Sequence, residues 1–222
     1  MIKLHKLLLF ILLPIFGFTQ NETLTADEIW GNYINTFGDK EEVYSIETYE
    51  CTFEMSSDFG VTKGRMRIIR PDKVRSDFKY PNGAKVTFLI NGDSGIIKSP
   101  GGIEPMPEED LAQFKLTALI FPELTYQILC LNEDEKIEGK NYYSIDMLAN
   151  NDTLTYLLYK DNFQVYRIID KNGYTEVLET QHIDNFLLVK WVKYISEENI
   201  MVTNYKKQWI NRRISKRHFK LK

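Results

Sequence analysis

The sequence predicts a mostly β protein of the α+β class, and three observations support this prediction. Apolar and polar residues alternate with a period of two over much of the chain. Short segments rich in Asn, Asp, Gly and Pro separate these stretches, and only two stretches have the period of a helix. The chain has 222 residues and contains no repeat, linker or low-complexity segment. We therefore expect a single domain with a substantial core.

The first nineteen residues have the organisation of a cleavable secretory signal peptide. A basic start with two lysines precedes an apolar run over residues 7–18, and Gly17 and Thr19 are the small residues expected before a cleavage site. The run is too short for a permanent anchor, because about 20 apolar residues are needed to span a bilayer. No cysteine stands at the cleavage site, so lipid attachment there is not expected. We expect residues 1–19 to be removed and residues 20–222 to form the exported domain.

Charge is distributed unevenly along the chain. The sequence has 28 basic and 31 acidic residues, and loss of the two lysines of the signal peptide leaves a net charge of about −5. From Asn199 onward there is no acidic residue. This basic tail either attracts anionic lipid head groups or an acidic partner, or is the solvated face of terminal strands. Its basic residues are Lys206, Lys207, Arg212, Arg213, Lys216, Arg217, Lys220 and Lys222.

The first element after the signal peptide is an amphipathic helix over residues 26–37. Thr25 and Glu28 have the spacing of a capping box, and Gly38 suits the left-handed end of a helix. The apolar residues recur at helical spacing and form one wide stripe. They are Ala26, Ile29, Trp30, Tyr33, Ile34 and Phe37.

The next region changes to strand period. Alternation predicts strands over residues 49–55, 61–70, 73–80 and 85–90, and turn segments such as Asn91-Gly92-Asp93 separate or follow them. This pattern is typical of an antiparallel meander of hairpins with one apolar face.

A loop and a second helix interrupt the strands. Residues 99–107 are rich in Gly and Pro and are interpreted as loop. The helix is expected to begin near Pro107, with three acidic residues in its first turn, and to end at Pro122. Its apolar residues indicate a helix that lies against the concave side of a sheet. They are Leu111, Phe114, Ala118, Leu119 and Phe121.

Strand patterns fill the remainder of the chain. Turn segments rich in Asn, Asp and Gly separate them. The predicted strands cover residues 142–147, 153–160, 164–170, 174–180, 186–195 and, in two pieces, 199–219.

The sequence lacks the usual motifs of catalysis and metal binding. His182 and His218 stand alone, without Cys or carboxylates at metal-ligand spacing. There is no nucleophile elbow, phosphate-binding glycine loop or dinucleotide fingerprint. The acidic clusters at residues 108–110 and 133–135 have ordinary structural explanations. We expect a non-enzymatic protein that binds no nucleic acid.

The chain has two cysteines, Cys51 and Cys130. An exported protein permits them to form a disulfide, which would add about 4 kcal/mol of stability for a loop of this length. Two separately buried thiols are the alternative, and the sequence does not decide between them.

Arg70 is the polar residue that the strand pattern places most unexpectedly. By parity it shares a face with Met66 and Ile68, which should be apolar. Because burial of an unpaired guanidinium is costly, Arg70 is either ion-paired inside, borders a cavity where it meets a ligand, or turns out to solvent beside Pro71.

Several of these segments together resemble the periplasmic lipoprotein carriers of the LolA family and their LolB-like relatives. The order is an amphipathic helix that opens Ala26-Asp27-Glu28-Ile29-Trp30, a strand, Gly64-Arg65-Met66-Arg67-Ile68-Ile69-Arg70-Pro71, Val74-Arg75-Ser76-Asp77-Phe78 and Asn91-Gly92-Asp93. The start of the helix is also similar to proteins of the lipoprotein-sorting type from Bacteroidetes.

This resemblance implies an incomplete antiparallel β-barrel of about eleven strands with helices that cover its concave face. It further implies a periplasmic, monomeric carrier that needs no cofactor and whose apolar interior receives the acyl chains of lipoproteins or lipids, with inner- and outer-membrane proteins as partners. The arginine of the Arg-Pro pair, Arg70 here, is implied to lie near the cavity and to affect loading and release of cargo.

We therefore expect a non-covalent carrier that binds acyl chains for transfer to the outer membrane. The same apolar residues would otherwise form the core of a closed barrel, and the alternative function is a cell-envelope binding or sensing module that engages a protein partner. The predicted lipid-binding residues are Met66, Ile68, Val74, Phe78, Val86 and Phe88 on one wall, Leu111, Phe114, Ala118 and Leu119 on a helical lid, and Arg70 at the mouth.

Overall fold

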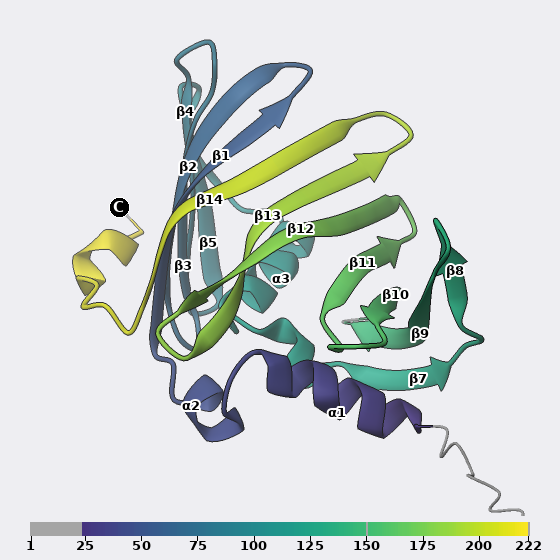
Figure 1. Cartoon of the computed structure of the whole chain (residues 1–222). Helices are drawn as coiled ribbons and strands as arrows, with labels where there is room; N and C mark the ends of the chain where they lie inside the picture. Colours follow the sequence, from purple (N-terminus) through teal and green to yellow (C-terminus); the bar gives the residue numbers. More distant parts are fainter. Residues whose placement is uncertain (1–23, 150, 222) are drawn as a thin grey trace, which may run out of the picture.

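The computed structural model describes residues 24–149 and 151–221. One curved antiparallel sheet of 14 strands dominates these residues, and helices cover parts of it (Figure 1). The sheet is not closed, so the expectation of an incomplete antiparallel barrel is confirmed. The expected signal peptide, residues 1–19, lies outside the described residues.

The elements follow one another along the chain as a helical start, a first run of strands, a central helix and a second run of strands. The helices are α1 (Ala26–Thr36), α2 (Lys40–Tyr44), α3 (Glu108–Thr117), and the 3-10 helices η1 (Pro122–Thr125) and η2 (Lys216–Phe219). The first strands are β1 (Thr48–Ser57), β2 (Gly60–Ile69), β3 (Lys73–Lys79), β4 (Lys85–Asn91), β5 (Ser94–Ser99) and β6 (Gly102–Pro105). The later strands are β7 (Gln127–Leu131), β8 (Glu135–Ile137), β9 (Lys140–Ala149), β10 (Asp152–Tyr159), β11 (Val165–Asp170), β12 (Gly173–Ile183), β13 (Phe186–Ser196) and β14 (Ile200–Ile210).

The sheet is continuous because the last strand pairs with the first. Its order is β6-β5-β4-β3-β2-β1-β14-β13-β12-β11-β10-β9-β7, with β8 paired to β9 off this path. Every neighbouring pair is antiparallel, and nearly all are joined by hairpins. The β1–β14 pair is the long-range connection that joins the two runs of strands into one surface.

Helix α1 forms as the sequence predicts. The Thr25 hydroxyl accepts a hydrogen bond from the Glu28 backbone N–H, and the Glu28 carboxylate accepts one from the Thr25 backbone N–H. This capping box satisfies two of the free donors at the helix start. The helix ends at Thr36, and Gly38 follows it with a φ of 136°.

Four strands differ from the sequence prediction. Residues 94–105 form the β5–β6 hairpin, although residues 99–107 were interpreted as loop and no strand was predicted over 94–99. Strands β7 and β8 were not predicted either. The described residues therefore contain 14 strands, where about eleven were expected.

Two helical segments also correct the prediction. Helix α3 ends at Thr117 and does not continue to Pro122, so Ala118 and Leu119 lie beyond its last turn. The second piece of the predicted C-terminal strand is the 3-10 helix η2, whose Phe219 is buried. In Figure 1, η2 lies outside the curve of the sheet, whereas α3 lies inside it.

A row of aromatic side chains crosses the concave face and ends on α3. Tyr205, Phe53, Phe78 and Phe88 come from β14, β1, β3 and β4, with successive ring centroids 6.0, 5.7 and 5.7 Å apart. Phe114 of α3 stacks on Phe88 at 5.1 Å. Such pairs add about 0.5–1.5 kcal/mol each beyond their buried area, so this row attaches α3 to the sheet.

A second aromatic cluster attaches α1. Trp30 contacts Tyr156 of β10 edge to face at 5.0 Å, and Tyr33 lies next to both Trp30 and Phe37. Phe37 stacks on Phe121, which follows α3, at 4.8 Å. The stripe of α1 therefore packs on the later strands and on the segment after α3, and this leaves α1 and α3 at separate places on the concave face.

The convex face carries a charged cluster that alternation alone did not indicate. Glu50 is only 3% exposed and pairs with Arg65, with Arg67 at 3.1 Å and with Arg212 at 3.6 Å. Arg67 also pairs with Asp77 at 2.8 Å. A buried carboxylate needs such partners, because an unpaired one would cost several kcal/mol.

Both cysteines are free thiols, so the disulfide alternative is not observed. Cys51 is buried in β1, and burial raises the pKa of its thiol to about 11. Cys130 is exposed on β7 and was therefore wrongly grouped with buried thiols in the second alternative.

Within residues 24–149 and 151–221, no helix has the length and hydropathy to cross a bilayer.

Gly64 is required where β2 passes under an aromatic ring. It pairs with Phe53 across the β1–β2 ladder, and a methyl group on Gly64 would overlap that ring. We predict that Gly64→Ala lowers the free energy of unfolding by about 1–3 kcal/mol, because Phe53 must leave its place in the aromatic row. Urea unfolding measures this change.

The matched control is Gly31→Ala in α1, where an added methyl group meets no atom within 4 Å. Because Ala favours helix over Gly, this variant should be more stable by about 0.5–1 kcal/mol. Equal effects of the two substitutions would contradict the assignment of Gly64.

Candidate functional site

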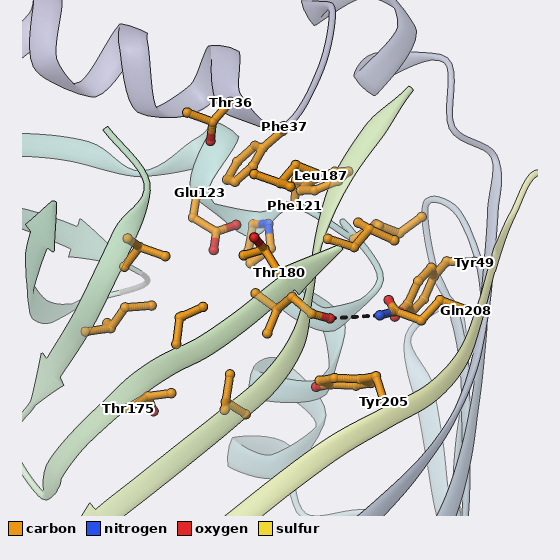
Figure 2. Close-up of a pocket in the computed structure, with 18 of the residues that line it drawn as sticks. Thr36, Phe37, Tyr49, Phe121, Glu123, Thr175, Thr180, Leu187, Tyr205 and Gln208 are labelled. Carbon is orange, nitrogen blue, oxygen red and sulfur yellow. Dashed lines mark hydrogen bonds between the residues drawn. The ribbon is translucent and has the colours of Figure 1, made fainter. Parts of the chain in front are cut away.

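A cavity of about 470 Å³ lies on the concave face between α1, the segment after α3 and the sheet (Figure 2). This volume is within the range of about 300–1,000 Å³ that is typical of small-molecule sites. Strands β1, β2, β11, β12, β13 and β14 all contribute to its wall. The lining is mainly apolar and includes Ile168, Val177, Leu188, Val189, Val192 and Tyr205.

The segment between α3 and η1 closes one side of the cavity. Ile120 and Phe121 line it, and Phe121 is held by its stacking contact with Phe37 of α1. Ile120 has a φ of 68°, which is unfavourable for a β-branched residue. This strained residue turns the chain sharply after α3, so that the following residues face the cavity and not the solvent.

A short polar chain crosses one part of the wall. The Tyr49 hydroxyl donates to Oε1 of Gln208 at 2.6 Å, and Nε2 of Gln208 donates to the carbonyl oxygen of Val189 at 2.8 Å. Figure 2 shows the bond made by Gln208 at the side of the cavity where Tyr205 also lies. Because these polar groups bond to one another, they present a largely satisfied surface to a ligand.

Glu123 is the charged residue of the cavity. It is the second residue of η1, and Figure 2 shows its carboxyl group among the lining side chains. Removal from water raises the pKa of this carboxyl group to about 7, although a hydrogen bond from its own backbone N–H acts in the opposite direction. Among the described residues, no Lys, Arg or His forms an ion pair with it or lines the cavity.

The predicted lipid-binding residues are distributed over two parts of the concave face. Met66 and Ile68 line the cavity. Six others belong to the hydrophobic cluster beside it, namely Val74, Phe78, Phe88, Leu111, Phe114 and Ala118. Val86 and Leu119 are half-buried and do not line the cavity.

Arg70 lies at the end of β2, away from the cavity lining. Its guanidinium donates to the carbonyl oxygens of Val43, Tyr44 and Ile46, at 3.4, 3.4 and 3.2 Å. These oxygens belong to the last turn of α2 and the residues after it, where a cation is favourable. Arg70 thus has partners within the protein, and its role in cargo loading stays a prediction.

The sequence analysis did not identify Glu123 or the strands that form most of the cavity wall. Glu123 follows Pro122, which was interpreted only as a helix end, and the cavity wall formed by β11–β14 was not assigned. The continuous apolar run over residues 186–189 was the available signal for that wall. Within the described ranges, His, Cys, Asp and Glu side chains form no group of three that could hold a metal ion.

No family model and no curated protein matches this sequence. Solved structures that are similar to it include three with a TM-score above 0.5. A LolA superfamily protein from Nitrosomonas europaea has a TM-score of 0.62 at 11% identity, over 89% of this chain and 98% of that one. A DUF1329 family protein from Desulfovibrio piger has a TM-score of 0.61 at 12% identity, over 90% and 98%.

The third is a domain described as an outer membrane lipoprotein-sorting protein, from Vibrio parahaemolyticus. Its TM-score is 0.56 at 10% identity, over 78% of this chain and 88% of that one. At such identities the likeness concerns the fold. The chain therefore has a LolA-like fold, as the resemblance of its Arg-Pro and Asn-Gly-Asp segments predicted.

We predict that Arg70→Leu lowers the free energy of unfolding by about 1–3 kcal/mol, because three carbonyl oxygens lose a charged donor. Arg70→Lys keeps a cation but not the forked donors, and its stability should lie between the two. Urea unfolding measures both. A Leu variant with wild-type stability but altered lipid release would instead favour a role in cargo handling.

We predict that Glu123→Gln stabilises the protein increasingly as pH rises. The folded pKa of about 7 exceeds the ordinary 4.5, so between these values the folded state binds more protons than the unfolded state. The contribution of Glu123 to the free energy of unfolding is therefore fully present below pH 4.5 and is lost as the pH rises through 7. The variant should match wild type near pH 4.5 and exceed it by about 2–3 kcal/mol at pH 8, as measured by urea unfolding. A constant difference would contradict this.

Proposed function

We propose that this protein is a non-enzymatic carrier that binds acyl chains of lipoproteins or lipids in the concave cavity. The observation that carries the proposal is an apolar cavity of about 470 Å³ within a LolA-like fold. The carrier domain would be residues 20–222, and it would act as a periplasmic monomer after removal of residues 1–19. Its cargo would be passed between inner- and outer-membrane proteins for delivery to the outer membrane.

Burial of an acyl chain supplies enough free energy for such binding. Each buried CH₂ group contributes about 0.8 kcal/mol, so a chain of several carbons in the cavity offsets the cost of ordering the ligand. Apolar side chains from different strands, such as Ile68 of β2 and Val192 of β13, provide this surface. In this proposal Met66 and Ile68 contact the chain directly, and the predicted residues beside the cavity support its wall.

The walls also suggest how cargo enters. Together with α1, helix α3 and the segment after it cover the cavity without being part of the sheet. Helix α3 is attached to the sheet mainly by Phe114 and neighbouring apolar residues. Movement of α3 and the segment after it would open the cavity to a ligand without breaking strand pairing. We propose that α3 and this segment serve as the lid.

The first test is native mass spectrometry of protein purified from a Gram-negative periplasm. We expect co-purified lipid, and uptake of a fluorescent fatty acid after delipidation. A clean apo mass together with no uptake would contradict the carrier proposal.

A pair of variants on adjacent residues tests whether the cavity is the binding site. Val177→Trp places a large ring in the cavity and should reduce uptake of the fluorescent fatty acid at least tenfold. Leu178→Trp adds the same ring on the same strand, but Leu178 is 50% exposed and does not line the cavity, so uptake should be unchanged. Equal uptake by both variants would place the binding site elsewhere.

A cell-envelope module that engages an acidic protein partner is the second candidate. Its support is the positive potential beside η2, where burial and then Arg67, Arg75, Arg217 and Arg65 lower the pKa of His218. Arg213, Lys216 and Arg217 are exposed there. Substitution of these three by Ser should abolish partner capture if this candidate is correct and leave lipid uptake unchanged if the carrier proposal is correct.

A further inference from the structure

We propose that the cavity selects amphiphiles whose head group carries a cationic amine, and that Glu123 is the residue that binds this amine. The inference rests on the proposed carrier function and names the chemical class of its ligand. It concerns the polar end of the ligand, whereas the carrier proposal concerns its acyl chain.

The charge distribution of the cavity supports a cation and opposes an anion. Glu123 contributes a carboxyl group, and no lysine, arginine or histidine is among the described residues that line the cavity. A phosphate or carboxylate head would therefore meet no countercharge and would face an acidic group. An ammonium group would instead form a charge-assisted hydrogen bond with a carboxylate whose hydrogen-bond partner among the described residues is its own backbone N–H.

The aromatic rings around Glu123 favour the same ligand. Tyr33, Phe37 and Phe121 line the cavity together with Glu123, and Phe37 and Phe121 stack on each other at 4.8 Å. Ring faces attract cations, most strongly where water is excluded. A carboxylate beside several aromatic rings is therefore suited to a desolvated ammonium group.

The titratable groups that face Glu123 are tyrosines, and they carry no charge near neutral pH. They are Tyr33 of α1, Tyr156 of β10, and Tyr126, which follows η1. Burial and the neighbouring Glu123 raise the pKa of each tyrosine, so all three are neutral between pH 6 and 8. Of these four groups, the carboxyl group of Glu123 is therefore the one that changes its charge between pH 6 and 8, because its pKa is about 7.

The test uses isothermal titration calorimetry of delipidated protein with three probes of equal chain length, namely decylamine, decanol and decanoate. At pH 8 we expect decylamine to bind about tenfold or more tighter than decanol, and decanoate to bind most weakly. Lowering the pH to 6 should weaken decylamine binding about tenfold, because the ionised fraction of Glu123 falls, and should leave decanol unchanged. Glu123→Gln, which keeps the size of the side chain, should bind decylamine and decanol equally at both pH values.

The outcomes separate the two proposals. Binding of decanol without any preference for decylamine, or an amine preference that persists in Glu123→Gln, would overturn the amine proposal and leave the carrier proposal intact. Failure of all three probes to bind would overturn both. Urea unfolding of Glu123→Gln confirms that the variant is folded when the probes are compared.

Discussion

Two sets of aromatic contacts hold the helices on the concave face, and the remaining features follow from their separation. One row runs from Tyr205 to Phe114 and fixes α3 over the first strands. The other joins Trp30, Tyr33 and Phe37 of α1 to the later strands and to Phe121. Because aromatic rings are large and rigid, they fill the concave face at these two places. The space between them is bounded by aliphatic side chains of β11 to β13 as well as by some of these rings, and there the cavity remains.

The two faces of the sheet differ in whether their buried carboxyl groups have basic partners. On the convex face Glu50 is buried but surrounded by arginines, so its charge is compensated where it lies. On the concave face Glu123 has no such partner among the described residues, and its carboxyl group is correspondingly hard to ionise. A compensated charge contributes to structure, whereas an uncompensated one remains available to a ligand. This contrast is why the concave carboxyl group, and not the larger convex cluster, enters the functional proposals.

Local chemistry made part of this architecture predictable from sequence. Thr25 and Glu28 defined the start of α1, and strict alternation defined β1 to β4, because both depend on near neighbours in the chain. The β5–β6 hairpin was missed because Pro100 and the glycines beside it indicate a loop equally well as a tight turn. Glu123 could not have been predicted, since its environment is created by α1 and β10, far away in sequence. Met66 and Ile68 line the cavity, in agreement with the face that parity gave them, whereas Arg70 follows the end of β2, where the alternation of a strand no longer fixes the direction of a side chain.

An open sheet also has two free rims, and each is protected against association with other chains. At one rim β6 is only four residues long, contains Glu104 and ends at Pro105, which has no N–H to offer an incoming strand. At the other rim β7 lies against α1, and the short strand β8 pairs with β9 beyond it. An open sheet would otherwise expose unpaired strand edges. The protein thus remains unclosed without becoming prone to aggregate through strand addition.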